Sequence, residues 1–250
     1  MTKILQHHED GVLTLTFNRV ERKNCIDVAM YDALATALEE TAGDAETRAM
    51  LIQGDETVFS AGNDLEDFLN NTLLGHDSPG LRFLRAISTY PKPLLAAVCG
   101  PAIGVGTTML LHCDLVYAGD NAVFSMPFVD LGLCPEAAAT LLAPRMFGYH
   151  RAAEALLLGA SFSAEEALSI GLVNRVVAPK ECKALALAQA RKMASKPLST
   201  LIITKQLMKS GQQDAVQRQI DAEITHFVRL LGEPAARKAM TAFMEKRKNQ

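Results

Sequence analysis

Residues 93–119 read PLLAAVCGPAIGVGTTMLLHCDLVYAG, and the order of elements in this stretch decides the fold class. After a proline, the apolar run 94–100 predicts a buried strand. A glycine-rich turn over 100–106 follows, and then an apolar helix over 107–113 and a second strand over 114–118. A strand, a helix and a second strand in this order are typical of an α/β fold.

The same alternation continues on both sides of this stretch, up to about residue 180. Asp27 is expected to cap the first helix, and Ile4 and Leu5 are expected to pair with the first strand. Strands are predicted over 11–17, 48–53 and 172–177, and helices over 81–90, 135–158 and 163–170. From residue 181 onward the chain is predicted to be helical, with an apolar stripe of Val216, Ile220, Ile224, Phe227 and Leu231 and a last helix that begins at Pro234.

Composition excludes several classes of partner. The 250 residues are 49% hydrophobic and 21% charged, with a net charge of −3, and the only basic run is Lys246–Lys248. Without a basic patch in the body of the chain, nucleic acid is not an expected partner. No apolar run reaches the length of a membrane span and no apolar signal core opens the chain, so we expect no membrane partner and a cytoplasmic location.

Cysteine and histidine usage argues against disulfides and metal sites. The five cysteines, at positions 25, 99, 113, 134 and 182, are odd in number and include no CxxC pair. They are therefore expected to be reduced thiols, most of them buried. The six histidines show no metal-ligand spacing, so no metal site is expected.

Two glycine loops follow predicted strands, GPAIGVG at 100–106 and FSAGND at 59–64. A loop that opens a helix exposes unpaired backbone N–H groups, although close packing is the favoured explanation for the glycines of 100–106 alone, and a simple turn for 59–64 alone. A dinucleotide site is disfavoured because Met109 stands where a third glycine would be needed, and no phosphate-binding P-loop motif is present. Two such loops together suit an oxyanion hole.

Glu136 stands out in the stretch LGLCPEAAA, residues 131–139, because its neighbours are almost all apolar. One interpretation is a helix start, where an acid complements the helix dipole. The other is a catalytic base in an apolar pocket. Cys134 is a further candidate nucleophile, but a small buried thiol explains it better.

Several ordered motifs identify the family. They are FSAGNDL (59–65), the stretch GPAIGVGTTMLLHCDLVYAGDNAVFSMP (100–127), NRVERKNCIDVAM (18–30), GLVNRVV (171–177) and AFMEKRK (242–248). Over nearly its whole length the chain resembles the crotonase superfamily, also called the enoyl-CoA hydratase/isomerase family.

The resemblance implies an α/β fold in which repeated ββα units wind into a spiral over residues 1–195. A helical region over 196–250 would build a homotrimer or a hexamer. The substrate would be an acyl-CoA thioester, so coenzyme A belongs to the substrate and no separate cofactor is expected. The backbone N–H groups of Asn63 and Val105 would bind the thioester oxygen. Coenzyme A contacts are implied for Lys23, Cys25, Ala61, Asp64, Leu65, Phe243 and Lys246.

This chain differs from the family pattern at two positions, and the differences argue against hydration. Hydratases of this family carry two glutamates, and at those positions this chain has Thr108 and Phe128. Glu136 remains, and its surroundings resemble most closely the peroxisomal-type Δ3,Δ2-enoyl-CoA isomerase branch. One base can take a proton from C2 and return it at C4. The apolar neighbours are expected to raise the pKa of Glu136, and a helix N-terminus would lower it.

Three alternatives remain open at this point. Asp130 is a possible second carboxylate, which would permit hydration. Another crotonase-type acyl-CoA reaction, such as a ring-opening isomerisation, would use the same oxyanion hole. A non-catalytic acyl-CoA binder would need the amides but no base.

Overall fold

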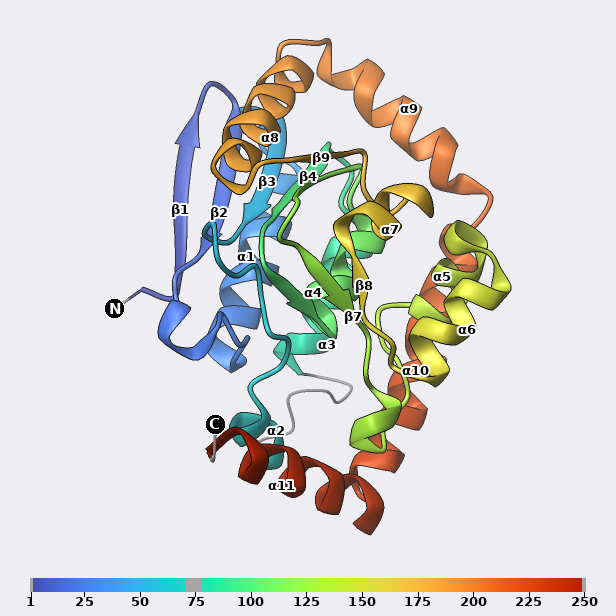
Figure 1. The fold of residues 1–250 in the computed structure, drawn as a ribbon. Helices are drawn as coiled ribbons and strands as arrows, with labels where there is room; N and C mark the ends of the chain where they lie inside the picture. Colours follow the sequence, from blue (N-terminus) through green and yellow to red (C-terminus); the bar gives the residue numbers. More distant parts are fainter. Residues whose placement is uncertain (1, 71–77, 249–250) are drawn as a thin grey trace.

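The computed structural model describes residues 2–70 and 78–248, and a six-stranded sheet forms its centre (Figure 1). The strand order is β1-β2-β3-β4-β6-β9; β1 and β2 are antiparallel and all other neighbours are parallel. The strands are β1 (Ile4–Glu9), β2 (Val12–Phe17), β3 (Ala49–Gln53), β4 (Leu94–Val98), β6 (Leu115–Gly119) and β9 (Arg175–Val177). The predicted strands, including the pairing of Ile4 and Leu5 with the first of them, are confirmed.

A second, three-stranded sheet consists of β5 (Pro101–Ile103), β7 (Val123–Ser125) and β8 (Phe162–Ser163). The consecutive strands β4 and β5 lie in different sheets, as do β6 and β7, so the chain winds as a spiral of ββα units and the expected fold class is confirmed. The sequence analysis was wrong to treat 101–103 as a turn, and it missed β7. Strands of three residues carry too little hydrophobic periodicity to be recognised.

Helices cover both faces of the large sheet. Helix α1 (Val28–Ala42) begins as predicted, since the Asp27 carboxylate accepts the Met30 N–H over 3.0 Å. It packs with α3 (Pro79–Thr89) on one face. On the other face, alanines of α8 (Pro179–Ala194) pack on apolar side chains of β2, β3, β4 and β6. A short helix that was not predicted, α2 (Leu65–Asn70), follows the first glycine loop.

The segment around the candidate base differs from the prediction of one helix over 135–158. It contains two helices, α5 (Ala139–Phe147) and α6 (Tyr149–Leu157), which are separated by Gly148 with a φ of 78°. Helix α5 begins at 139 because Ala137 and Ala138 adopt left-handed backbone conformations, with φ of 62° and 55°. Such residues cannot continue a right-handed helix, so Glu136 precedes the helix rather than opening it.

The second glycine loop leads into α4 (Val105–Thr108) and then a 3-10 turn, η2 (Met109–His112), in place of one uniform helix over 107–113. Helix α7 (Ala164–Ser169) begins with a capping box between Ser163 and Glu166. The 3-10 turn η3 (Val129–Leu131) follows β7.

Three helices, α9 (Leu198–Ser210), α10 (Gln213–Leu231) and α11 (Pro234–Lys248), end the chain. The stripe on α10 is confirmed: Leu231 is partly buried against the core, and the other four residues of the stripe are buried. Figure 1 shows α10 running beside α5, and α11 crossing near α2. Among the helices of residues 2–70 and 78–248, none is long and apolar enough to cross a membrane.

Candidate active site

The two glycine loops lie against each other at the edge of the second sheet. Ser60 forms a bridge to β5, and the N–H of Ile103 donates to the Ser60 carbonyl over 2.9 Å. A Cβ at Gly62 would lie 2.7 Å from the Ile103 carbonyl oxygen, and a Cβ at Gly106 would lie 2.8 Å from the Ser60 carbonyl oxygen. The glycines therefore permit a close approach of two backbones that any side chain would prevent.

The amides of Asn63 and Val105 belong to these two loops. Val105 is the first residue of α4, where the helix itself offers no acceptor for the N–H group. Within residues 2–70 and 78–248, no oxygen accepts a hydrogen bond from either N–H. The Tyr31 hydroxyl donates to the Asn63 side-chain oxygen over 2.5 Å and so fixes the first loop to α1. Both expected oxyanion donors are thus unpaired.

A mainly apolar pocket of about 440 Å³ opens beside these loops. Pockets of this size and character suit small organic ligands. Its walls are Lys23, Ala61, Gly62, Asn63, Leu65, Pro101, Ile103, Gly104, Pro127, Phe128, Asp130, Leu131, Leu133 and Phe227.

Of the residues expected to contact coenzyme A, the structure places Lys23, Ala61 and Leu65 on the pocket wall. Cys25 and Asp64 are buried and do not line it. The side chains of Phe243 and Lys246 lie outside the described residues.

Asp64 has a different role in the described chain. Its carboxylate forms an ion pair with Arg19 at 2.7 Å, and its N–H donates to the Ile26 carbonyl. Burial alone would raise the pKa of Asp64, but the hydrogen bond and charge of Arg19 outweigh it and the pKa is lowered. The paired carboxylate and N–H of Asp64 therefore hold the first glycine loop in place.

Glu136 is completely buried, on the segment that precedes α5. Its Oε1 lies 3.4 Å from the Thr108 hydroxyl, which is one turn of α4 after Val105. Its Oε2 has no hydrogen-bond partner in the described part of the chain. An unpaired buried carboxylate oxygen is costly, which is typical of functional groups rather than structural ones.

Burial raises the pKa of Glu136 to about 8, and the negative charge of Glu223 adds to this effect, while the hydrogen bond from Thr108 opposes it. The predicted direction is therefore confirmed. The pKa of Tyr31 is raised well above its usual value by burial and by the charge of Glu136. Because Tyr31 also holds Asn63, the carboxylate is close to both glycine loops, through Thr108 on one side and Tyr31 on the other.

The two positions that carry glutamates in hydratases are filled by groups that cannot ionise. Thr108 contacts Glu136, and Phe128 is buried on the pocket wall. The Phe128 ring lies 3.9 Å from the position that a Cβ at Gly104 would take. Asp130 is exposed on the wall, with its carboxylate beside Gly159.

The sequence analysis missed three residues around Glu136, namely Tyr31, His112 and Glu223. One signal was available: Glu223 lies three residues after Ile220 and four before Phe227, so it falls on the apolar face of α10. A carboxylate on a buried face is itself informative.

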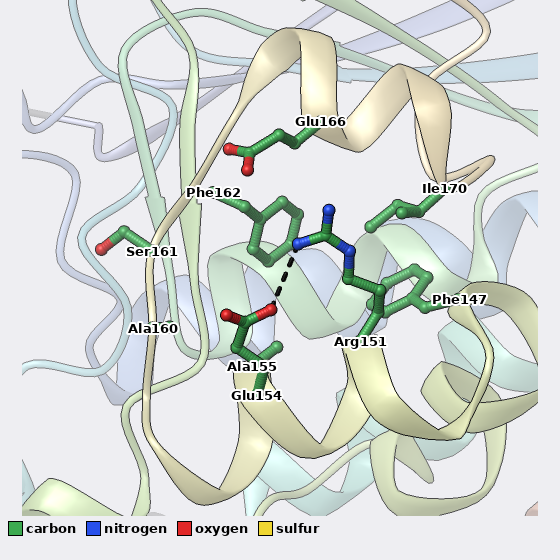
Figure 2. A pocket seen from close by; sticks show the side chains of 9 residues that line it. All are labelled: Phe147, Arg151, Glu154, Ala155, Ala160, Ser161, Phe162, Glu166 and Ile170. Carbon is green, nitrogen blue, oxygen red and sulfur yellow. Dashed lines mark hydrogen bonds and ion pairs between the residues drawn. The ribbon is translucent and has the colours of Figure 1, made fainter.

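Two other hollows have polar groups that are already paired with one another. Figure 2 shows the smaller, of about 60 Å³, between α6 and α7, where Arg151 forms an ion pair with Glu154 at 3.2 Å. A hollow of about 480 Å³ between α3 and α9 contains Lys205, whose ammonium donates to Asp114 over 2.7 Å. These hollows bring no unpaired reactive group together with the glycine loops.

Comparison with known proteins agrees with this geometry. The profile of the family described as Enoyl-CoA hydratase/isomerase matches residues 7–250. The 1,2-epoxyphenylacetyl-CoA isomerase of Escherichia coli is 37% identical, over 100% of this chain and 98% of that protein. Enoyl-CoA delta isomerase 2 of Rattus norvegicus is 33% identical over 89% of this chain, which spans 58% of the length of the rat protein.

A solved structure extends the likeness to the backbone. The enoyl-CoA hydratase/isomerase of Pseudoalteromonas atlantica has a TM-score of 0.94 and 40% identity, with 98% of each chain covered. With the spiral fold, the paired glycine loops and this match over its full length, the chain belongs to the enoyl-CoA hydratase/isomerase family, the crotonase superfamily.

Proposed function

We propose that this protein is a Δ3,Δ2-enoyl-CoA isomerase. Glu136 takes a proton from C2 of a 3-enoyl-CoA and returns it at C4, while the Asn63 and Val105 amides bind the thioester oxygen. Removal of the C2 proton places negative charge on that oxygen, and two preorganised N–H donors stabilise it. One carboxylate serves both transfers because it is a base in the first and an acid in the second.

The observation that carries this proposal is the buried carboxylate of Glu136, which lies next to α4 and is the one carboxylate with an unpaired buried oxygen among residues 2–70 and 78–248. Water addition needs a second ionisable group, and Thr108 and Phe128 supply none. The apolar wall suits an acyl chain, and the exposed Lys23 suits the anionic part of coenzyme A. Coenzyme A enters as part of the substrate, and the proposed reaction uses no other cofactor.

The test is incubation of the purified protein with a 3-enoyl-CoA, with appearance of the conjugated 2-enoyl thioester as the readout. The parallel reaction is 2-enoyl-CoA with water. Isomerisation without hydration supports the proposal. Hydration without isomerisation would contradict it and would favour the second candidate, a hydratase in which Asp130 on the pocket wall is the second acid.

A third candidate follows from the E. coli relative, which is named as an isomerase of 1,2-epoxyphenylacetyl-CoA. The same oxyanion hole would serve a ring-opening isomerisation of an aromatic acyl-CoA. Turnover of that substrate but not of a 3-enoyl-CoA would favour this reaction. Turnover of neither, with intact acyl-CoA binding, would favour a binder.

The pH dependence of kcat/KM is expected to report the buried base. Glu136 must be ionised to take the C2 proton, and its pKa is raised to about 8, so kcat/KM should rise with pH through a midpoint near 8 and level off about one unit above it. Thr108→Val removes the hydrogen bond that lowers this pKa, so the midpoint should move to higher pH. A midpoint that stays near 4.5 in both proteins would contradict the assignment.

Stability should change in the opposite direction over the same window. Because the pKa of Glu136 in the folded protein lies above its ordinary value of 4.5, the folded protein binds more protons than the unfolded chain between pH 4.5 and about 8. The free energy of unfolding should therefore fall as pH rises from about 4.5 to about 8, and it should fall less in Glu136→Gln.

We infer further that the protein acts in the cytoplasm, in the β-oxidation of unsaturated acyl chains, as a homotrimer or hexamer. The 2-enoyl thioester is the form that hydration requires. Support for assembly comes from α9, where Ile203, Leu207 and Met208 are 55%, 70% and 77% exposed. Apolar side chains grouped in this way are typical of an interface.

A further inference from the structure

Glu223 is a carboxylate in an apolar environment. It is 4% exposed, and its neighbours on the buried face of α10, Ile220, Ile224 and Phe227, are at most 1% exposed. Burial of a carboxylate is unfavourable unless hydrogen bonds or charges compensate it. The partners of Glu223 therefore show what the residue does.

The Glu223 carboxylate accepts its hydrogen bonds, among the described residues, from the segment directly after Glu136. One carboxylate oxygen accepts the Ala138 N–H over 2.6 Å, and the other accepts the Thr140 N–H over 2.9 Å and the Thr140 hydroxyl over 2.5 Å. The Thr140 hydroxyl in turn accepts from Gln219. The Glu223 side chain on α10 thus caps the N-terminal end of α5.

This segment has an unusual backbone. Ala137 and Ala138 are both left-handed, although neither is glycine. Left-handed alanine is strained, so it persists only where its surroundings hold it. Glu223 holds the Ala138 N–H, and the His112 ring N–H donates to the Ala137 carbonyl over 2.8 Å from the opposite side. The position of Glu136 depends on these two contacts.

The charge of Glu223 also acts on Glu136. Burial raises the pKa of Glu223 itself to about 7, although its three hydrogen bonds lower it, whereas Glu136 has one long hydrogen bond and a pKa of about 8. The two carboxylates lose their protons in two coupled steps. Because the ionised form is better stabilised at Glu223, Glu136 keeps its proton longer.

The other titratable groups that face this pair are neutral near pH 7. Burial raises the pKa of Tyr31 well above its usual value and that of Cys134 to about 11, and it lowers the pKa of His112 to about 4. The cations on this side of the molecule act on other groups: Arg229 lowers the pKa of Cys134, and Lys209 donates to the His112 carbonyl over 3.2 Å. Glu223 is therefore the charged group that acts on Glu136.

We propose that Glu223 is the positioning residue of the proton-transferring carboxylate: it locks the left-handed turn that presents Glu136, and its negative charge keeps a proton on Glu136 for return to the substrate. The proposal rests on the isomerase function proposed above. Glu223 touches no reacting atom, and its effect passes entirely through Glu136.

Two substitutions of Glu223 separate the effect of its negative charge from the effect of its hydrogen bonds to the turn after Glu136. Glu223→Gln removes the charge and replaces one acceptor with an N–H₂ group, so the midpoint of kcat/KM should move to lower pH by about one unit. In the same variant kcat should fall at least about 10-fold, because the turn loosens. Glu223→Asp keeps the charge but shortens the reach, so kcat should fall while the midpoint stays in place.

The matched control is Gln217→Ala, which lies on the same helix and loses a hydrogen bond to Ser88 rather than to the turn. It should change neither kcat nor the midpoint. A Glu223→Gln protein with an unmoved midpoint, or with a loss of kcat that only follows the folded fraction, would overturn the proposal. Retained isomerisation in Glu136→Gln would instead overturn the proposed function, whatever Glu223→Gln does.

A second measurement needs neither activity nor a folded Glu223→Gln protein. Infrared difference titration of the wild type and of Glu136→Gln follows the protonated-carboxyl C=O band. Because Glu223 is already ionised when Glu136 titrates, the wild type should show two titration steps of buried carboxyls, and Glu136→Gln should lack only the step at higher pH. If Glu136→Gln lacked the step at lower pH instead, Glu136 would be the more acidic of the two carboxyl groups, and the proposal would be overturned.

Discussion

Glu136→Gln is expected to lower kcat for isomerisation by roughly 10³-fold and to leave the affinity for a saturated acyl-CoA unchanged. Glutamine has nearly the same shape, but it cannot accept and return a proton. Because the side chain keeps its size, the space for the acyl chain should be unchanged, and a saturated acyl-CoA has no proton transfer that would require the charge of Glu136. The measurements are single-turnover kinetics and the equilibrium binding of an acyl-CoA that has no double bond.

The matched control is Glu165→Gln, which makes the same chemical change at an exposed position on α7. It should retain wild-type kcat. Loss of both turnover and affinity in Glu136→Gln would indicate that Glu136 shapes the pocket instead of transferring protons. Full turnover would show that another group is the base, and Asp130, which lines the pocket, would be the next residue to replace.

Gly62→Ala is expected to have the second-largest effect, a loss of roughly 10²- to 10³-fold in kcat. Gly62 has a φ of 85°, and an added Cβ would lie 2.7 Å from the Ile103 carbonyl oxygen. The first glycine loop must therefore move away from the second, and the Asn63 N–H moves with it. The thioester oxygen would lose one of its two donors in the transition state.

Gly148→Ala separates this effect from backbone strain. Gly148 has a φ of 78°, and no atom lies within 4 Å of the position of its added Cβ. The Gly148→Ala protein should have a lower melting temperature, because alanine at a positive φ is strained as it would be at position 62. Its kcat should equal that of the wild type. If both variants lost stability and activity in parallel, the loss in Gly62→Ala would follow from unfolding and not from the displaced amide.

Much of the fold could be predicted because its elements carry strong periodic signals. The apolar runs of β3 and β4, the Asp27 cap and the stripe on α10 are each encoded within a few neighbouring residues. The errors fall where local signals are weak or are overridden. Strands β5 and β7 have three residues each, and α5 begins at 139 because contacts from distant segments hold the turn before it.

The candidate site, like the fold, could be predicted in part from the sequence. The motifs led to Asn63, Val105 and Glu136 as candidate site residues, and Thr108 and Phe128 at the positions of two acids favoured a reaction that uses one base. The motifs also led to Cys25 and Asp64 as coenzyme A contacts, which stays a prediction, and the structure adds that the Asp64 carboxylate is paired with Arg19. A motif records which residues occur together, but it does not record which of their groups are already paired.

The sequence by itself determined the family, the order of the main strands and helices, and the identity of the buried acid, since each depends on residues that are close together in the chain. Only the tertiary structure decided how basic that acid is. The charge that acts on Glu136 comes from Glu223, and the turn that presents it is held by Glu223 and His112. Electrostatic interactions depend on distance and burial in space, and residues 87 positions apart (223 minus 136) acquire both only when the chain folds.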